Sequence, residues 1–289
     1  IEKSAFEGCE KITEISIPKN VELIGEGAFS ECIRLNSIQL NEGLKEIGKE
    51  AFSNCERISK ILIPNTITQI GENAFQNIIL LKDDFVNNSG LNAEENKYWG
   101  AVIYSKTDEG LYISNNKIVK VDEDIESCKI PQGVMGIGEC AFYECSTLKE
   151  IIIPESVTSI GNGAFYGCSA LEKITIPQSV TNIGDGAFSA CYSLKEITIP
   201  ESVTRIGEET FCGCTALTKV VIPKGVTSIG ARAFSDCHAL ENIIIPDKVT
   251  SIEEGVFSWC HSLEQIKIPD RVTSIGESAF LGCISLEEI

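Results

Sequence analysis

Thiol chemistry is the first possibility that this 289-residue sequence raises, because it contains 13 cysteines. Ten of them follow a phenylalanine by three residues: Cys9, Cys32, Cys55, Cys145, Cys168, Cys191, Cys214, Cys237, Cys260 and Cys283. Equivalent inward side chains run parallel, which does not suit the dihedral angle of a disulfide, and cysteine also behaves as a small buried apolar residue. We therefore expect a column of buried thiols, with a disulfide framework as the alternative. Cys128, Cys140 and Cys212 lie outside the column and are the candidates for exposure or pairing.

Metal binding is the second possibility, at Cys237-His238 and Cys260-His261. Two cysteines and two histidines could hold zinc tetrahedrally. If each cysteine faces inward, however, the histidine beside it must face outward or sideways. We therefore expect both histidines on a solvated turn, and we predict no metal and no cofactor.

Acid–base catalysis is the third possibility, because the sequence is rich in carboxylates. They occupy periodic positions such as Glu150, Glu172, Glu196 and Glu264, which is typical of a solvated face. Neither histidine is placed to activate a serine or cysteine nucleophile. Paired acids for glycoside hydrolysis remain the enzymatic alternative, since two columns could bring carboxylates to a working separation. The sequence favours a protein that is not an enzyme.

A repeat of 23 residues must position all of these side chains. Its clearest marker is a phenylalanine that recurs in two groups: Phe6, Phe29, Phe52 and Phe75, then Phe142, Phe165, Phe188, Phe211, Phe234, Phe257 and Phe280. All nine prolines also share one position of the repeat. A strict period without drift over seven consecutive units predicts stacked, near-identical coils, which form a solenoid.

The residues of a single repeat, 171–194, predict the local structure of one coil. Residues 171–176 have the Leu-x-x-Ile-x-Ile spacing of a leucine-rich-repeat strand, and Pro177 ends that strand because it lacks an N–H donor. Residues 179–183 form a second short extended piece, and Gly184 supplies a bend. The spacing of 187–194 predicts one tight helical turn. The fold class is therefore an α/β leucine-rich-repeat solenoid, a right-handed, β-rich horseshoe with one parallel strand per coil and short 3-10 or helical turns on its convex side.

The period fails between Phe75 and Phe142, where 67 residues separate the two phenylalanines. Residues 102–105, 111–114 and 117–121 look like three short strands joined by turns. We expect a single solenoid in three parts. These are N-terminal repeats at 1–75, an irregular insert with a small β-meander at 76–130, and regular repeats at 131–289.

The consensus Ile-Pro-x-Ser-Val-Thr-x-Ile-Gly-x-x-Ala-Phe-x-x-Cys-x-x-Leu-x-x-Ile-x resembles the BspA-like leucine-rich repeat over essentially the whole chain. Departures are few: Ile78 replaces the cysteine, Glu253 the glycine, and Thr210 and Val256 the alanine. The resemblance implies a secreted or surface-displayed protein that binds host matrix proteins or other cells, without a catalytic residue. Because both termini fall inside a repeat, we also expect this chain to be a piece of a longer protein.

The charge balance narrows the class of partner. Lys plus Arg number 24 and Asp plus Glu number 42, which gives a formal net charge of −18. Nucleic acid and anionic membrane surfaces attract basic faces, so both are disfavoured. No run of residues is apolar for long enough to span a membrane.

The concave face is the predicted binding site. The residue between the two inward isoleucines of each strand points outward, and in the regular repeats this column reads Ile152, Thr175, Thr198, Val221, Ile244 and Lys267. Val221 and Ile244 would form a small apolar patch, and exposed patches can mark interaction sites. The alternative is that these residues only suit strands. We predict a binding or adhesion module for a protein or glycan, with a structural spacer as the rival.

Overall fold

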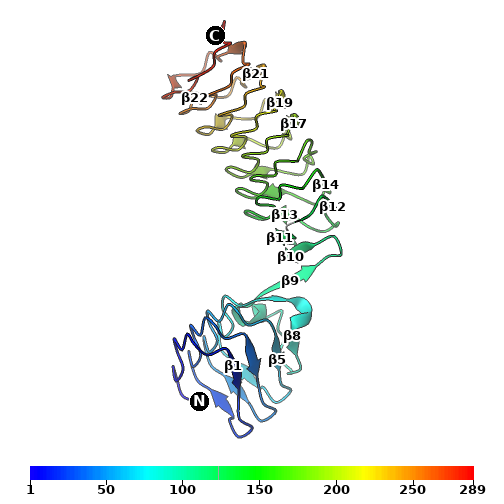
Figure 1. The fold of residues 1–289 in the computed structure, drawn as a ribbon, viewed down its shortest axis with the longest axis vertical. Helices are drawn as coiled ribbons and strands as arrows, with labels where there is room; N and C mark the ends of the chain where they lie inside the picture. The colour runs from blue at the N-terminus through cyan, green and yellow to red at the C-terminus, as the bar shows by residue number, and fades with distance from the viewer. Residues whose placement is uncertain (123) are drawn as a thin grey trace. The chain divides into compact units, whose positions relative to one another are not determined.

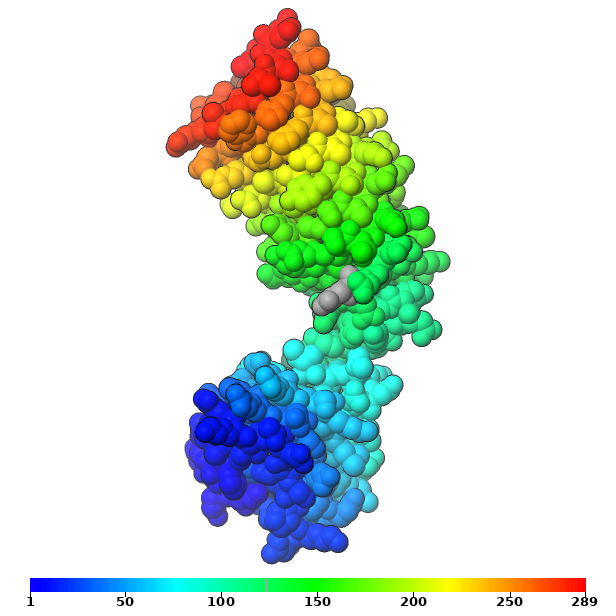
Figure 2. All heavy atoms as spheres, in the orientation of Figure 1, coloured from blue at the N-terminus to red at the C-terminus, as the bar shows by residue number. Residues whose placement is uncertain are grey.

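The computed structural model describes residues 1–122 and 124–289, which divide into two compact units, 1–106 and 107–289. Each unit is a stack of flattened coils (Figure 1), and Figure 2 shows the successive coils of each unit as layers packed on one another. The predicted solenoid and its 23-residue coil are confirmed, because neighbouring strands pair in parallel with partners 23 residues apart, as Ile197 does with Val220.

Most regular coils contain two short extended pieces, the expected parallel strand and the second piece that the sequence also predicted, whereas residues 173–175 form only an isolated bridge at Lys173. The first strands of unit 1 are β1 (Glu14–Ser16), β3 (Ser37–Gln39), β5 (Ile61–Ile63) and β8 (Phe85–Asn87). Those of unit 2 are β12 (Ser127–Lys129), β14 (Glu150–Ile152), β17 (Glu196–Thr198), β19 (Lys219–Val221), β21 (Asn242–Ile244) and β23 (Gln265–Lys267). In Figure 1, β14, β17 and β19 lie along one side of unit 2.

The second strands have two residues each. In unit 1 they are β2 (Leu23–Ile24), β4 (Glu46–Ile47) and β6 (Gln69–Ile70). In unit 2 they are β13 (Gly136–Ile137), β15 (Ser159–Ile160), β16 (Asn182–Ile183), β18 (Arg205–Ile206), β20 (Ser228–Ile229), β22 (Ser251–Ile252) and β24 (Ser274–Ile275). The isoleucine that ends each strand is buried in nearly every coil, so this second piece builds the core together with the first strand.

The turn around each phenylalanine is not helical, which differs from the expectation. Gly186 and Ala190, two residues before and after Phe188, have φ of 61° and 58°, and every regular coil repeats this pair of positive φ angles. A helix needs consecutive residues in the right-handed region, so these two positions end it. The N–H groups of Phe188 and Ala190 instead donate to the next coil, at Thr210 O (2.9 Å) and Cys212 O (2.7 Å). Among the described residues, helix is confined to two 3-10 turns, η1 (Lys82–Asp84) and η2 (Lys97–Gly100).

A ladder of stacked phenylalanine rings runs through the core of each unit. The rings of Phe165 and Phe188 lie 5.4 Å apart and are 5° from parallel, and Phe211 continues the stack at 5.6 Å. Such offset stacks are favourable beyond the apolar area they bury. The ladder therefore contributes much of the packing between coils.

The predicted column of inward thiols is confirmed next to this ladder. The thiol of Cys191 donates to the carbonyl oxygen of Phe165 in the preceding coil at 3.2 Å. The same hydrogen bond is made by Cys32, Cys55, Cys168, Cys214, Cys237, Cys260 and Cys283. No disulfide joins the cysteines of the described residues, and outside the column Cys128 is buried, Cys212 is half-buried and Cys140 is exposed.

The three strands expected in the irregular segment correspond to β9 (Val102–Lys106), β10 (Leu111–Ser114) and β11 (Lys117–Val121). In unit 1, β9 pairs in parallel with β7 (Ile79–Leu81). The carbonyl of Trp99 accepts the N–H of Phe75 at 3.0 Å, as the alanine carbonyl of the next coil does in the regular repeats, and the ring of Trp99 lies 6.5 Å from Phe85. The irregular residues thus complete the N-terminal stack of coils.

In unit 2, β10 and β11 form an antiparallel hairpin. β11 then pairs in parallel with β13 through Ile118 and Ile137, and β13 continues to β15 and β16. The hairpin is therefore part of the column of second strands rather than a decoration on the solenoid.

Candidate binding surface

The six residues predicted to face outward lie in one row on unit 2. They are Ile152, Thr175, Thr198, Val221, Ile244 and Lys267, and all six are exposed. Strand alternation places them, since Ile197 is buried and Thr198 beside it is not. Thr198 is in register with Val221, and Ile244 with Lys267. We call this row the strand face.

Three members of the strand face are large apolar residues in solvent. Ile244 is 83% exposed, Ile152 51% and Val221 43%. Val221 and Ile244 end β19 and β21, which lie in contact. Isolated exposed apolar residues are normal, but several of them in one row on stacked coils supply a preformed contact area.

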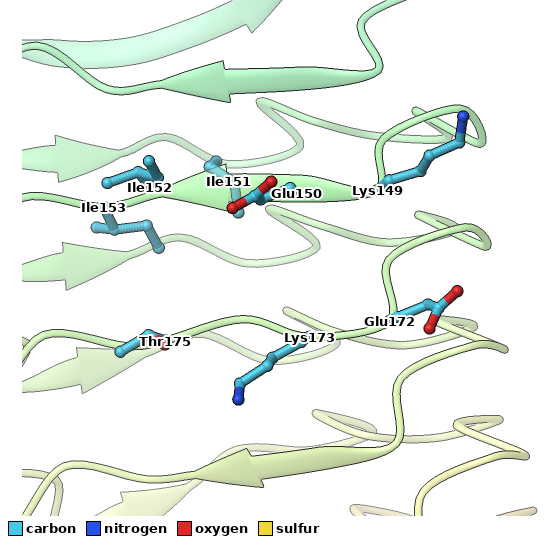
Figure 3. A pocket seen from close by; sticks show the side chains of 8 residues that line it. All are labelled: Lys149, Glu150, Ile151, Ile152, Ile153, Glu172, Lys173 and Thr175. Atoms are coloured by element: carbon cyan, nitrogen blue, oxygen red, sulfur yellow. The ribbon is translucent and has the colours of Figure 1, made fainter.

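A hollow of about 620 Å³ opens at one end of the strand face. Its lining residues are Lys149, Glu150, Ile151, Ile152, Ile153, Glu172, Lys173 and Thr175 (Figure 3). Two neighbouring coils supply them, the coil that contains β14 and the coil after it. The hollow thus includes Ile152 and Thr175 of the strand face.

The hollow lies at one of the places where the ladder of first strands is interrupted, as it also is between β3 and β5 and between β19 and β21. On one side β14 pairs with β12, and on the other Lys173 bridges to Glu196. Between 149–153 and 172–176, all of which the structure describes, no backbone hydrogen bond forms. The same two coils remain joined elsewhere, because β15 pairs with β16. The coils therefore separate only on the strand face.

The ion pairs around the hollow do not join the two coils that line it. Lys149 binds Glu126 at 2.9 Å, Lys195 binds Glu172 at 2.6 Å and lowers the pKa of that carboxyl by hydrogen bonding, and Lys173 binds Glu196 at 3.4 Å. None of these pairs crosses from one coil at the break to the other.

Glu150 lies between Lys149 and Lys173, whose side chains turn away from it. Figure 3 shows its carboxylate over β14, with Lys149 and Lys173 extended in opposite directions away from it. Among the described residues no lysine, arginine or histidine forms an ion pair with Glu150. The site thus combines one carboxylate without a counter-charge and an apolar wall of Ile152 and Ile153.

The two histidines lie on the opposite, turn side of their coils, as expected. Their rings stack 4.5 Å apart, and Nε2 of His238 lies 3.7 Å from Asp236. The thiols of Cys237 and Cys260 point inward to phenylalanine carbonyls, so cysteines and histidines diverge. Within the described part of the chain, no group of three or more His, Cys, Asp or Glu residues has a geometry that could hold a metal ion.

Sequence reasoning placed the row of outward residues but missed the hollow. Glu150 and Glu172 were expected to be solvated carboxylates of equal standing, yet only Glu172 has a lysine partner. The column of Glu150 continues with Lys173 and Glu196, so the sequence leaves open which of the two glutamates Lys173 pairs with, and the structure pairs it with Glu196. In the described residues no helix is long and apolar enough to cross a membrane.

Comparison with known proteins gives matches at the level of sequence family and of fold. A family model described as BspA type leucine-rich repeat region (6 copies) matches residues 1–98, 113–240 and 181–289. Among curated proteins no sequence matches this chain.

Several solved structures are similar to this chain. A leucine-rich repeat protein from Bacteroides ovatus is 28% identical, with a TM-score of 0.51, over 99% of this chain and 81% of that chain. The T. pallidum leucine-rich repeat protein is 32% identical, with a TM-score of 0.57, over 64% of this chain and 88% of that chain. A leucine-rich repeat protein from Eubacterium ventriosum is similar in fold, with 24% identity and a TM-score of 0.59 over 94% of this chain and 83% of that chain.

Proposed function

Because the chain belongs to the family of BspA type leucine-rich repeat proteins, we propose that it is a non-enzymatic binding or adhesion module at the cell surface or outside the cell. Its partner is a protein or a glycan, such as a host matrix protein, and the contact surface is the strand face. The observation that carries this proposal is the row of exposed side chains that includes Ile152, Val221 and Ile244. No cofactor takes part.

The rigidity of the scaffold supports this proposal. Parallel pairing holds first strands in register two by two, as for β17 and β19, and the buried phenylalanine stack holds successive coils at fixed separations. A surface that is ordered before binding loses little conformational entropy when a partner docks. Large apolar side chains on such a surface supply the anchors that dominate interface energy.

The use of the reactive side chains supports a role without catalysis. His238 and His261 stack on each other, and the thiols of Cys237 and Cys260 donate to backbone carbonyls in the core. Several surface carboxylates, such as Glu172, already pair with lysines of the adjacent coil. These groups are therefore engaged in structural contacts.

The experiment is binding of the full chain to an array of extracellular matrix proteins and glycans. The chain is compared with a Val221→Lys/Ile244→Lys double variant, whose substituted positions are both exposed, so the fold should be kept. Tyr192→Lys is the matched control, since Tyr192 is an exposed apolar residue on the turn side of unit 2. We expect a ligand whose affinity falls at least about tenfold in the double variant and is unchanged in the control.

Two results would contradict the proposal. A ligand bound equally by parent and double variant would move the site away from the strand face. No ligand for a folded chain would favour the rival function, a structural spacer that holds another domain away from the cell.

A further inference from the structure

We propose that the hollow at the break in the strand ladder receives a basic side chain, arginine above all, from an extended segment of a protein partner, with Glu150 as its counter-charge. This inference rests on the proposed function and names the chemistry of the partner. It is carried by the hollow, by the direction of the surrounding ion pairs and by the position of Glu150.

The hollow is open space that the solenoid itself leaves unfilled. Its two coils stay joined through Ile160 and Ile183 of the second strands, and through the N–H of Phe165, which donates to Ala187 O at 2.8 Å. On the strand face the same coils make no hydrogen bond, and the hollow of about 620 Å³ lies there. A partner's side chain could therefore enter without displacing any ladder contact.

Charge selects a cation for this space. Lys149, Lys173 and Lys195 are each bound to a glutamate, and the carboxylate of Glu150 has no cationic partner among the residues that the structure describes. The chain as a whole carries a formal charge of −18, which attracts basic partners over longer distances. Anionic ligands such as phosphate would meet this carboxylate, and a divalent cation requires more oxygen ligands than Glu150 supplies.

The apolar wall selects a cation with an aliphatic stem. Ile152 is exposed and Ile153 is half-buried, and both line the hollow beside Glu150. Arginine and lysine lay their methylene groups along apolar surface while the charged head reaches a polar partner. Arginine fits best, because its planar guanidinium can bind one carboxylate through two parallel hydrogen bonds.

The neighbouring row favours a peptide segment over a free small cation. Thr175, Thr198 and Val221 continue from the hollow along the strand face, with exposed side chains in each successive coil. An extended peptide whose arginine occupies the hollow can place further residues along this row. A protein partner thus gains contacts that an isolated cation does not.

The test uses the full chain and the probe acetyl-Gly-Ile-Arg-Ile-Gly-amide, with binding followed by the methyl NMR signals of Ile152 and Ile153. The matched probe carries citrulline in place of arginine, which keeps the shape and removes the charge. Glu150→Gln removes the counter-charge, and Glu264→Gln is the control at an exposed carboxylate outside the hollow.

We expect the arginine peptide to shift both methyl signals. Its affinity should fall about tenfold with citrulline and about tenfold in Glu150→Gln, because a hydrogen bond to a charged group is lost, while Glu264→Gln binds as the parent does. Equal affinity of the two peptides, no effect of Glu150→Gln, or no shift at millimolar peptide would overturn the inference.

The two proposals fail differently. A protein ligand that is lost in Val221→Lys/Ile244→Lys but bound normally by Glu150→Gln would refute the arginine site and leave the binding function standing. If the arginine peptide binds in the hollow but no protein or glycan binds the strand face, the arginine site stands and the proposed binding function is refuted.

Discussion

Alkaline pH should unfold this protein through its buried thiols. Burial raises the pKa of Cys55 and of Cys128 from the ordinary 9.0 to about 12, and it raises the pKa of Cys191 and Cys237 well above 9.0. Above pH 9 these thiols ionise in the unfolded chain but stay protonated in the fold. The unfolded state then binds fewer protons, so stability falls as pH rises. The contribution of the buried thiols to stability is fully present below pH 9. It is lost as the pH rises toward their pKa in the folded protein, which for Cys55 and Cys128 is about 12.

The size of the effect follows from the number of thiols. Six buried thiols of unit 2 have pKa values raised by desolvation: Cys128, Cys168, Cys191, Cys214, Cys237 and Cys260. Each of these thiols lowers the free energy of unfolding by about 1.4 kcal/mol when the pH is raised to one unit above the pKa of the thiol in the unfolded chain. Together they would remove about 8 kcal/mol at pH 10, which is comparable to the whole stability of a typical domain, about 5–15 kcal/mol.

The assay is the free energy of urea unfolding at several pH values between about 7 and 10, under a reducing agent and without oxygen. The variant Cys191→Ala/Cys214→Ala is the comparison. It should be less stable than the parent at pH 7, because two buried thiols and their hydrogen bonds are lost. Its stability should fall by about 3 kcal/mol less than that of the parent on going to pH 10.

Lysine and tyrosine titrate equally in both proteins, so the difference between parent and variant isolates the thiols. A parent whose stability stays flat up to pH 10 would refute the reasoning. A variant that loses stability as steeply as the parent would refute it as well.

Three further predictions concern the repeat itself. Residues 186 and 190 both have positive φ, which glycine adopts more easily than alanine. Gly186→Ala should therefore destabilise the chain by about 1 kcal/mol, and Ala190→Gly should stabilise it by up to about 1 kcal/mol. Urea unfolding that gives the opposite signs would contradict this. Phe188→Ala should cost about 3–5 kcal/mol through the cavity left in the ring stack, and a change below about 1 kcal/mol in thermal or urea unfolding would count against the ladder. Deleting 176–198 should leave a chain with native circular dichroism and cooperative melting, because every ladder keeps its period, whereas deleting 176–187 should not.

The sequence alone determined which residues belong to the core. A period of 23 places the same residue type at the same point of every coil, so the phenylalanine and cysteine columns must face inward together, and strand alternation then turns Thr198 and Val221 outward. The strands of the irregular segment were also readable, because β10 and β11 are bounded by turn residues such as Asn115 and Asn116. These are local properties, set by spacing and by residue type.

The backbone conformation of the turn around each phenylalanine could not be predicted from spacing and residue type. The spacing of Ala187, Phe188 and Cys191 suits a helical turn, but positive φ at Ala190 is imposed by the hydrogen bonds to the next coil and not by the preference of alanine. Trp259 and Glu209 have the same conformation for the same reason. Contacts between coils therefore override local propensity at these positions.

Only the tertiary structure decided where the strand ladder breaks. Neighbouring coils offer equivalent strands, so a repeating sequence cannot show that β14 pairs with β12 and not with residues 173–175 of the following coil. Whether two coils meet or separate on one face depends on how pairing, packing and twist add up over the whole stack. The hollow and the unpaired charge of Glu150 are results of that sum, which is why the most specific candidate site in this chain became visible only after the coils were stacked.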